Sequence, residues 1–295
     1  MSLVVNEKGN FPKRIVLEST NHCNLRCPSC VTGIRWRKDR GFMDFEVFKK
    51  VVDEISLHEE CFYISLQGGG EPLLHKRIFD FFAYLDYKNP QIRSQISTNG
   101  TLLNEENASR IFDSPLKEIV FSVDGFKKET FERLRKGAGY DNVLSNIMRF
   151  LSRNKQMGNK LKTFVCFVRQ TDNEKEMEDF HHFWQDKVDD FYYSTYQTFT
   201  GIIPDKRTEA DKSKVPSERF ACRQLLRGDF VIHWDGTAYP CCRGFSDDLI
   251  LGNVKDSSIA SLFNGAVRAG LIRNHLEKRW DDVAGCRNCL QEWSF

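Results

Sequence analysis

The chain has 295 residues, 40% of them apolar, so it can bury the core of one large domain or of a large domain with a smaller appendage. Its 43 Lys and Arg residues nearly balance its 41 Asp and Glu residues, which argues against a protein that binds nucleic acid through a basic face. No apolar run approaches about 20 residues and the N-terminus lacks the apolar segment of a signal peptide, so we expect a cytoplasmic protein.

Strand-like and helix-like segments alternate through the first two thirds of the chain. Strands are predicted at Arg14–Ser19, Phe62–Gln67, Gln95–Thr98, Glu118–Val123, Thr163–Val168 and Phe191–Phe199. Helices are predicted at Asp44–Leu57, Lys76–Asp86, Asn104–Phe112, Val143–Gln156 and Lys175–Lys187. This alternation predicts an α/β fold with a parallel sheet, open or curled into a partial (β/α)6 barrel of TIM type. Ligands of such folds bind at the C-terminal ends of the strands.

The organisation changes after the sixth predicted strand. The charged segment Pro204–Pro216 lies between two prolines, which predicts a linker. A β-hairpin with an Asp-Gly turn and then a short helix are expected at Phe230–Trp234, Thr237–Tyr239 and Ser258–Phe263. We therefore expect a barrel domain over residues 1–203, a linker over 204–216 and a second domain over 217–295. Because about 13 residues precede the first strand, we expect no leader-peptide-binding domain there.

The ten cysteines are grouped near the two ends of the chain. Disulfides are rare in the cytoplasm, so metal binding or redox chemistry is the leading explanation for so many thiols. One group is Cys23, Cys27 and Cys30, and the other is Cys222, Cys241, Cys242, Cys286 and Cys289. The remaining two, Cys61 and Cys166, fall on predicted strands and are expected in the core.

The first group has the spacing C-x3-C-x2-C and follows the first predicted strand directly. A [4Fe–4S] cluster held by only three cysteines leaves one iron free to bind a cofactor or substrate. The alternative is a structural zinc site, which normally takes four protein ligands and would need His22 or a distant residue as the fourth.

The loop ESTNHCNLRCPSC resembles the signature loop of the radical S-adenosylmethionine (SAM) superfamily. Further matches follow at successive strand ends, in GGEP from Gly69, STNG from Ser97 and SVDG from Ser122. Ser29 departs from the family pattern, because the residue before the third cysteine is often aromatic. The resemblance implies a [4Fe–4S] cluster on Cys23, Cys27 and Cys30. It also implies SAM contacts from Gly69, Gly70, Glu71, Ser97, Asn99, Ser122, Asp124 and Arg135.

The segment Phe230–Phe263 resembles the auxiliary-cluster extension of that superfamily called SPASM, or its shortened form called twitch. Five cysteines are too few for the two clusters of the full pattern, so the resemblance implies one auxiliary [4Fe–4S] cluster. Its ligands would be Cys222, Cys241, Cys286 and Cys289. Cys242 could replace Cys241, and a zinc ion on the same four residues is the alternative.

The resemblance implies an enzyme that cleaves SAM to a 5′-deoxyadenosyl radical, which takes a hydrogen atom from the substrate. One outcome is dehydrogenation with the electron passed to the auxiliary cluster, as in aminoglycoside-pathway enzymes such as 2-deoxy-scyllo-inosamine dehydrogenase. The other is epimerisation, with Cys242 as the candidate hydrogen donor. We expect a small sugar- or aminocyclitol-like substrate and a flavodoxin- or ferredoxin-type electron donor. A peptide or protein substrate is one alternative, and a non-catalytic zinc-binding protein is another.

Overall fold

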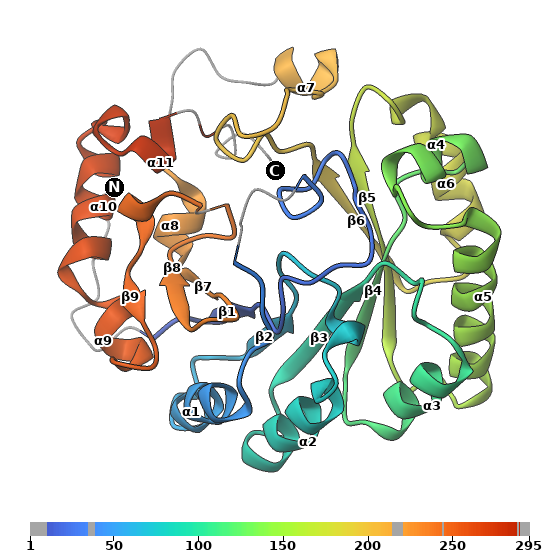
Figure 1. The fold of residues 1–295 in the computed structure, drawn as a ribbon, viewed down its shortest axis with the longest axis horizontal. Helices are drawn as coiled ribbons and strands as arrows, with labels where there is room; N and C mark the ends of the chain where they lie inside the picture. Colours follow the sequence, from blue (N-terminus) through green and yellow to red (C-terminus); the bar gives the residue numbers. More distant parts are fainter. Residues whose placement is uncertain (1–10, 35–38, 214–220, 244, 288, 290–295) are drawn as a thin grey trace.

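The computed structural model describes residues 11–34, 39–213, 221–243, 245–287 and 289. Within these residues, nine strands form one sheet in the order β6-β5-β4-β3-β2-β1-β7-β8-β9. The first six are β1 (Arg14–Leu17), β2 (Tyr63–Leu66), β3 (Arg93–Thr98), β4 (Glu118–Ser122), β5 (Lys162–Arg169) and β6 (Asp190–Thr195). Each of these pairs in parallel with its sequence neighbour, and the sheet curls into a partial barrel (Figure 1). The expected α/β partial barrel is confirmed.

Helices cover the outer side of the barrel strands (Figure 1). They are α1 (Phe45–Ile55), α2 (Ile78–Lys88), α3 (Glu105–Asp113), α4 (Lys128–Leu134), α5 (Tyr140–Gln156) and α6 (Met177–Trp184). The start of α1 shows why the chain turns helical there, since the Asp44 carboxylate caps it by accepting a hydrogen bond from Glu46 N at 2.7 Å. Its buried face includes Phe48, whose ring stacks on Phe81 of α2 with centroids 4.0 Å apart.

The C-terminal elements continue the barrel sheet. The predicted hairpin is present as β7 (Asp229–Ile232) and β8 (Thr237–Tyr239), and β9 (Gly252–Asn253) adds a third antiparallel strand. However, β7 also pairs in parallel with β1, with Ile15 opposite Phe230. The helices of this part are α8 (Arg223–Arg227), α9 (Ile259–Phe263), α10 (Ala266–Leu276) and α11 (Ala284–Arg287). The β1–β7 pairing therefore fixes the C-terminal cysteines relative to the barrel.

Several boundaries differ from the sequence-based expectations. The sixth strand was expected to reach Phe199 but ends at Thr195, and the expected linker contains a short helix, α7 (Glu209–Ser213). Helix α10 was not predicted because its apolar residues do not fall on one helical face. The end of the expected linker, 214–216, and the expected start of the second domain at 217 lie outside the described residues.

The barrel interior is polar at the end where the strands begin. The Tyr63 hydroxyl donates to Gln95 Oε1 at 2.8 Å, and Gln95 Nε2 donates to Glu118 Oε2 at 3.1 Å. Arg93 pairs with the same Glu118, whose side chain is buried. These bonds join β2, β3 and β4 across the interior, so polar side chains occupy this end of the barrel.

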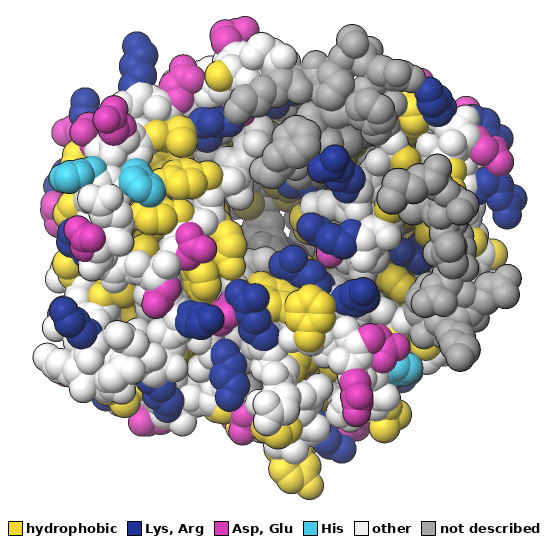
Figure 2. All heavy atoms as spheres, turned by 180° about the vertical axis from the view of Figure 1, so that it is seen from behind, with side chains coloured by type: hydrophobic (Ala, Val, Ile, Leu, Met, Phe, Trp, Pro, Cys, Tyr) yellow, Lys and Arg dark blue, Asp and Glu magenta, His cyan; other side chains and the backbone are white. Residues whose placement is uncertain are grey.

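The outer surface carries both charge signs. On the face in Figure 2, Lys and Arg side chains are interspersed with Asp and Glu among the described residues. Both signs are thus present on this side, as in the nearly balanced composition. Within the described residues, no helix combines the length and apolarity needed to cross a membrane.

Candidate active site

The loop after β1 carries three cysteines at the C-terminal edge of the sheet. Cys27 is buried and the other two, Cys23 and Cys30, are half-buried. Backbone bonds shape the loop, with Cys30 N donating to Cys27 O at 3.2 Å and Arg26 N donating to Lys136 O at 2.8 Å. The three thiols are close enough to influence one another electrostatically. The loop therefore brings together the three predicted ligands.

Burial raises the pKa of the Cys23 thiol, and it raises that of Cys27 to about 11. Both are neutral at pH 7 in the metal-free protein, and iron binding would have to release their protons. Among the residues that the structure describes, no three His, Cys, Asp or Glu side chains meet closely enough for a single metal ion. Three neighbouring thiols supply the three protein ligands of a [4Fe–4S] cluster with one open iron, whereas a structural zinc site normally takes four protein ligands.

The glycine run after β2 is clamped to the cysteine loop. Gly69 N donates to Glu18 Oε2 at 2.6 Å, and Glu71 N donates to His22 O at 2.8 Å. A Cβ on Gly70 would lie 2.4 Å from the carbonyl oxygens of Thr20 and His22, a distance that real Cβ atoms do not reach. Glycine is therefore required at this position for the two loops to meet.

The Glu71 side chain holds the ends of β2 and β3 together. It is buried, and its carboxylate accepts from Thr98 Oγ1 at 2.8 Å, Asn99 N at 2.8 Å and Leu73 N at 3.2 Å. Burial raises the pKa of this carboxyl group above its usual value. These bonds let Glu71 position the backbone at the ends of β2 and β3, and its expected contact with SAM stays a prediction.

Replacing Glu71 with Leu should destabilise the protein by about 3 kcal/mol, because three buried donors would lose their acceptor. Thermal unfolding should show this as a midpoint lowered by several degrees. Glu59→Gln is the matched control, since Glu59 is exposed and its replacement should leave the midpoint unchanged. An unchanged midpoint in Glu71→Leu would contradict the role assigned to these bonds.

The ends of β3 and β4 carry three of the expected SAM contacts, Ser97, Asn99 and Ser122, and Asn99 lies beside the cysteine loop. Asn99 Nδ2 donates to Asn24 Oδ1 at 3.0 Å and lies 3.9 Å from Cys23 Sγ. The hydroxyl oxygens of Ser97 and Ser122 are 3.4 Å apart on neighbouring strands. These side chains come from separate parts of the sequence, and the parallel sheet gathers them at one edge.

Arg135 is a cation beside the cysteine loop. Its Nη2 pairs with Asp124 Oδ2 at 2.8 Å, and Asp124 Oδ1 accepts from Val168 N at 2.9 Å. Burial alone would lower the pKa of Arg135, but Asp124 and nearby thiols including Cys27 raise it overall, so the guanidinium stays charged. Its buried Nε atom has no hydrogen-bond partner within the described structure. A donor in this state fits an anionic or carbonyl group of a bound cofactor.

Two buried residues after β5 were missed in the sequence and help to shape this edge. Asn173 Nδ2 donates to the carbonyl oxygen of Asp124 at 2.8 Å. The Glu176 carboxylate accepts from Phe126 N at 2.8 Å, Lys127 N at 3.0 Å and Thr130 Oγ1 at 2.6 Å. They tie the β5 turn to the loop after β4. Their N-x-x-E spacing directly after a predicted strand was the only sequence pattern that could have pointed to them, and this pattern is too short to be specific.

Cys166 was expected in the core, but it is half-buried on the inner face of β5. It lies opposite Ser122 in the β4–β5 register and interacts electrostatically with Asp124 and Arg135. Burial, and then the Asp124 charge, raises the pKa of this thiol to about 12. Cys61 does lie in the core, as expected.

The C-terminal cysteines gather next to β8 and α8. Cys241 is half-buried and interacts electrostatically with Cys222, Cys242 and Cys289. Burial raises the pKa of Cys241 well above its usual value. Cys286 lies on α11 and its carbonyl accepts from Cys289 N at 3.0 Å, which brings this pair into one turn. Of the adjacent pair, Cys242 is the exposed one. The environment of Cys241 therefore suits a cluster ligand better than that of Cys242.

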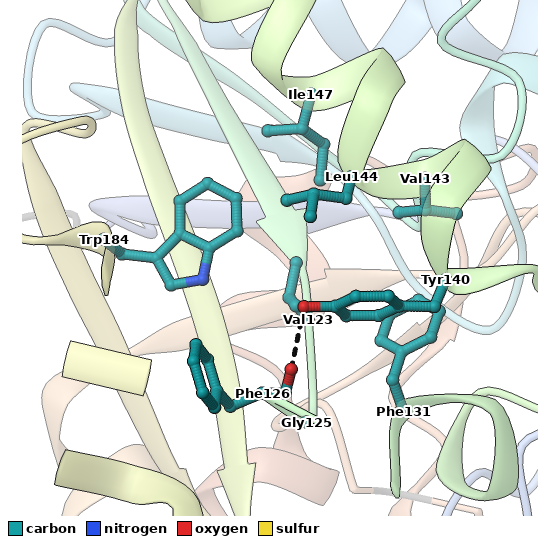
Figure 3. Close-up of a pocket in the computed structure, with 9 residues that line it drawn as sticks. All are labelled: Val123, Gly125, Phe126, Phe131, Tyr140, Val143, Leu144, Ile147 and Trp184. Atoms are coloured by element: carbon teal, nitrogen blue, oxygen red, sulfur yellow. Dashed lines mark hydrogen bonds between the residues drawn. The ribbon is translucent and has the colours of Figure 1, made fainter. Parts of the chain in front are cut away.

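An apolar cavity behind β4 is separate from these groups. Figure 3 shows it between Val123, Tyr140, Leu144 and Trp184, with the Tyr140 hydroxyl donating to the Phe126 carbonyl at 2.7 Å. Its volume of about 10 Å³ is near the minimum needed for one water molecule. It contains none of the cysteines, so we interpret it as a packing gap between the sheet and its outer helices.

Comparison with known families gives two matches. Residues 17–183 match the radical SAM superfamily, and residues 222–290 match an iron–sulfur cluster-binding domain, SPASM. Among solved structures, BtrN in complex with AdoMet and 2-DOIA has a TM-score of 0.64 at 19% identity, covering 96% of this chain and 94% of that one. Native anSMEcpe with bound AdoMet has a TM-score of 0.67 at 20% identity, covering 95% and 89%. At these identities the likeness establishes the fold.

Curated relatives include several different enzymes. A cysteine-type anaerobic sulfatase-maturating enzyme of Clostridium novyi is 22% identical over 93% of this chain and 84% of its own length. The tungsten-containing aldehyde ferredoxin oxidoreductase cofactor-modifying protein of Pyrococcus furiosus is 35% identical over 38% of this chain and 31% of its own length. The mycofactocin maturase of Mycobacterium ulcerans is 31% identical over 43% and 33%. The chain thus spans about a third of the length of the last two.

Proposed function

Since this chain belongs to the radical SAM superfamily and carries a SPASM domain, we propose that it oxidises a small sugar- or aminocyclitol-like substrate by two electrons. Its cofactors are SAM and a [4Fe–4S] cluster in the barrel. The SPASM domain binds auxiliary iron–sulfur clusters. A non-catalytic zinc-binding protein does not agree with this family membership. What is proposed is the reaction type, the substrate class and the role of each residue.

The proposed roles follow the geometry of the strand ends. Cys23, Cys27 and Cys30 would hold the radical SAM cluster. The Gly69–Gly70 backbone, Ser97, Asn99, Ser122, Asp124 and Arg135 would hold SAM, with Glu71 supporting them. When bound, these groups supply a 5′-deoxyadenosyl radical that removes a hydrogen atom from the substrate. The side chains packed at the other end of the barrel keep the reacting centre away from bulk water on that side.

The C-terminal cysteines support dehydrogenation over epimerisation. Cys222, Cys241, Cys286 and Cys289 would hold one auxiliary [4Fe–4S] cluster with all of its irons ligated, which suits an electron acceptor better than a substrate-binding site. Cys242 is exposed, and a thiol at the surface is poorly placed to donate a hydrogen atom inside the barrel. This exposure is the observation that carries the proposal of a dehydrogenase. One electron would leave the substrate with the hydrogen atom taken by the 5′-deoxyadenosyl radical, and the second would pass to the auxiliary cluster as the substrate radical releases a proton.

The direct test uses full-length protein purified without oxygen. We expect about eight irons per chain, and release of 5′-deoxyadenosine when SAM and a reductant are added. A reductant is required because the reaction needs an external electron, which a flavodoxin- or ferredoxin-type protein would supply in the cell. A colourless protein that leaves SAM intact would refute the proposed function.

Oxidation within a peptide is the second candidate. Strand β6 lies at the edge of the sheet, and its Tyr192 and Tyr193 side chains are exposed. An exposed edge strand can pair with an extended peptide. The long alignment with the sulfatase-maturating enzyme of Clostridium novyi also favours this candidate. Incubation with 2-deoxy-scyllo-inosamine and, separately, with a cysteine-containing peptide should show which of them increases 5′-deoxyadenosine release.

A further inference from the structure

Two buried amide side chains lie in the turn after β5, and they differ in their hydrogen bonds. Asn173 is 1% exposed, and its Nδ2 donates to the carbonyl oxygens of Asp124 at 2.8 Å and Val168 at 2.9 Å. Gln170 is also 1% exposed, yet neither Nε2 nor Oε1 has a hydrogen-bond partner in the described structure. Leaving a buried amide unpaired costs free energy, and most such groups in native proteins are paired.

The turn does not depend on the Gln170 amide. Asn173 Oδ1 accepts from Gln170 N at 2.9 Å, and the Gln170 carbonyl accepts from Asn173 N and Glu174 N, each at 3.0 Å. The backbone of Gln170 and the side chain of Asn173 thus fix the conformation. The Gln170 side chain contributes an unsatisfied donor and acceptor to the free protein.

Strand β5 ends at Arg169, and its alternation, continued by one residue, puts Gln170 on the inner side of the barrel. Phe167 points outward, because its ring packs 4.7 Å from that of Phe180 on helix α6. Cys166 lies on the inner face, where it interacts with Arg135. Successive residues of a strand point to opposite faces, so Val168 and then Gln170 continue the inner series from Cys166. The amide therefore follows the strand at its C-terminal, ligand-binding edge.

The sheet order separates Gln170 from the proposed SAM contacts. Those contacts come from the ends of β2, β3 and β4, whereas Gln170 follows β5, the next strand in the sheet. Adjacent strands are about 4.8 Å apart, so Gln170 lies one strand beyond Ser122 and Asp124. Beyond β5 there is only β6 among the described strands, and its outer edge is unpaired there. Gln170 therefore lies on the β5 side of the proposed SAM contacts, away from β1 and the cysteine loop.

We infer that the Gln170 amide binds the substrate through an uncharged group that both donates and accepts hydrogen bonds, as a hydroxyl does. Such a hydroxyl accepts from Nε2 and donates to Oε1, which satisfies both unpartnered atoms. The inference rests on the proposed function and specifies it, since it assigns a neutral, polyol-like part of the substrate to the β5 side. Gln170 then selects substrates that carry this hydroxyl, because an analogue without it leaves the buried amide unpaired.

The first measurement compares two isosteric replacements in the full-length, cluster-loaded protein. Gln170→Met removes an unpaired amide, so the thermal midpoint should stay the same or rise. Asn173→Leu is the matched control, because it removes a buried amide that makes three hydrogen bonds, and its midpoint should fall by several degrees. An equal fall in the midpoint of Gln170→Met would show that the amide stabilises the fold, and it would overturn the inference.

The second measurement uses SAM as the probe. Gln170→Met should bind SAM within about twofold of the wild type by calorimetry, and it should still release 5′-deoxyadenosine with a reductant. A tenfold loss of SAM affinity would assign the amide to the cofactor and overturn the inference. If wild-type protein does not cleave SAM, the proposed function fails, whereas a defect confined to Gln170→Met concerns only this residue.

The third measurement finds the substrate in the cell without assuming its chemical structure. A strain of the source organism lacking the gene is complemented with the wild type or with Gln170→Met, and small metabolites are compared by mass spectrometry. The compound that accumulates after deletion should disappear with the wild type and persist with Gln170→Met at equal protein level. Full clearance of that compound by Gln170→Met would overturn the inference.

Discussion

Cys27→Ala should abolish the release of 5′-deoxyadenosine from SAM, and this is the largest effect that we expect from a single substitution. Cys27 is the most buried of the three loop cysteines and lies in electrostatic contact with both of the others. Without its thiolate the radical SAM cluster would keep only two protein ligands, too few to hold it stably. Iron content, measured by metal analysis, should fall from about eight to about four per chain. Release of 5′-deoxyadenosine is measured by chromatography.

Cys61→Ala is the matched control for this substitution. Cys61 is buried in the core and burial raises its pKa to about 12, so its thiol is a small apolar group at pH 7. Its replacement should lower the thermal midpoint slightly and leave iron content and SAM cleavage intact. Equal loss of cleavage in both variants would point to general destabilisation. Full cleavage by Cys27→Ala would show that this loop does not hold the cluster.

The sequence predicted the site best where short motifs coincide with strand ends. Cys23–Cys30 follows β1, Gly69–Gly70 follows β2, and Ser122 ends β4, so the parallel sheet had to bring them to one edge. The roles of individual side chains were harder to predict. Glu71 is part of a recognisable motif, but only the structure shows that its carboxylate bonds to Thr98 and Asn99.

Features that depend on long-range contacts could not be predicted. Nothing in the local pattern at Asp229–Ile232 indicates that this strand pairs with β1, about 200 residues earlier, because pairing is decided by the completed barrel edge. The unpartnered amide of Gln170 could not be predicted either, because a buried glutamine and an exposed one look the same in a sequence. The inner position of Cys166 was missed because a half-open barrel leaves inner-face residues partly exposed, whereas a flat packed sheet would bury them.

Cys286→Ala should separate SAM cleavage from substrate oxidation. The barrel loop with Cys23, Cys27 and Cys30 is untouched, so release of 5′-deoxyadenosine without substrate should stay near the wild-type rate. The auxiliary cluster should be lost, because Cys286 is paired in one turn with Cys289, which in turn lies near Cys241. Oxidised product per 5′-deoxyadenosine should fall at least tenfold, and iron content should fall to about four per chain.

Cys242→Ala distinguishes the two possible outcomes of the substrate radical. Cys242 is exposed while its neighbour Cys241 is half-buried among the other cysteines, so we expect Cys242→Ala to keep its iron, its SAM cleavage and its product. An epimerase that used this thiol would instead form the substrate radical and fail to return a hydrogen atom. Unchanged product in Cys242→Ala, together with lost product in Cys286→Ala, would establish dehydrogenation through the auxiliary cluster. The opposite pair of results would identify Cys242 as the donor and the enzyme as an epimerase.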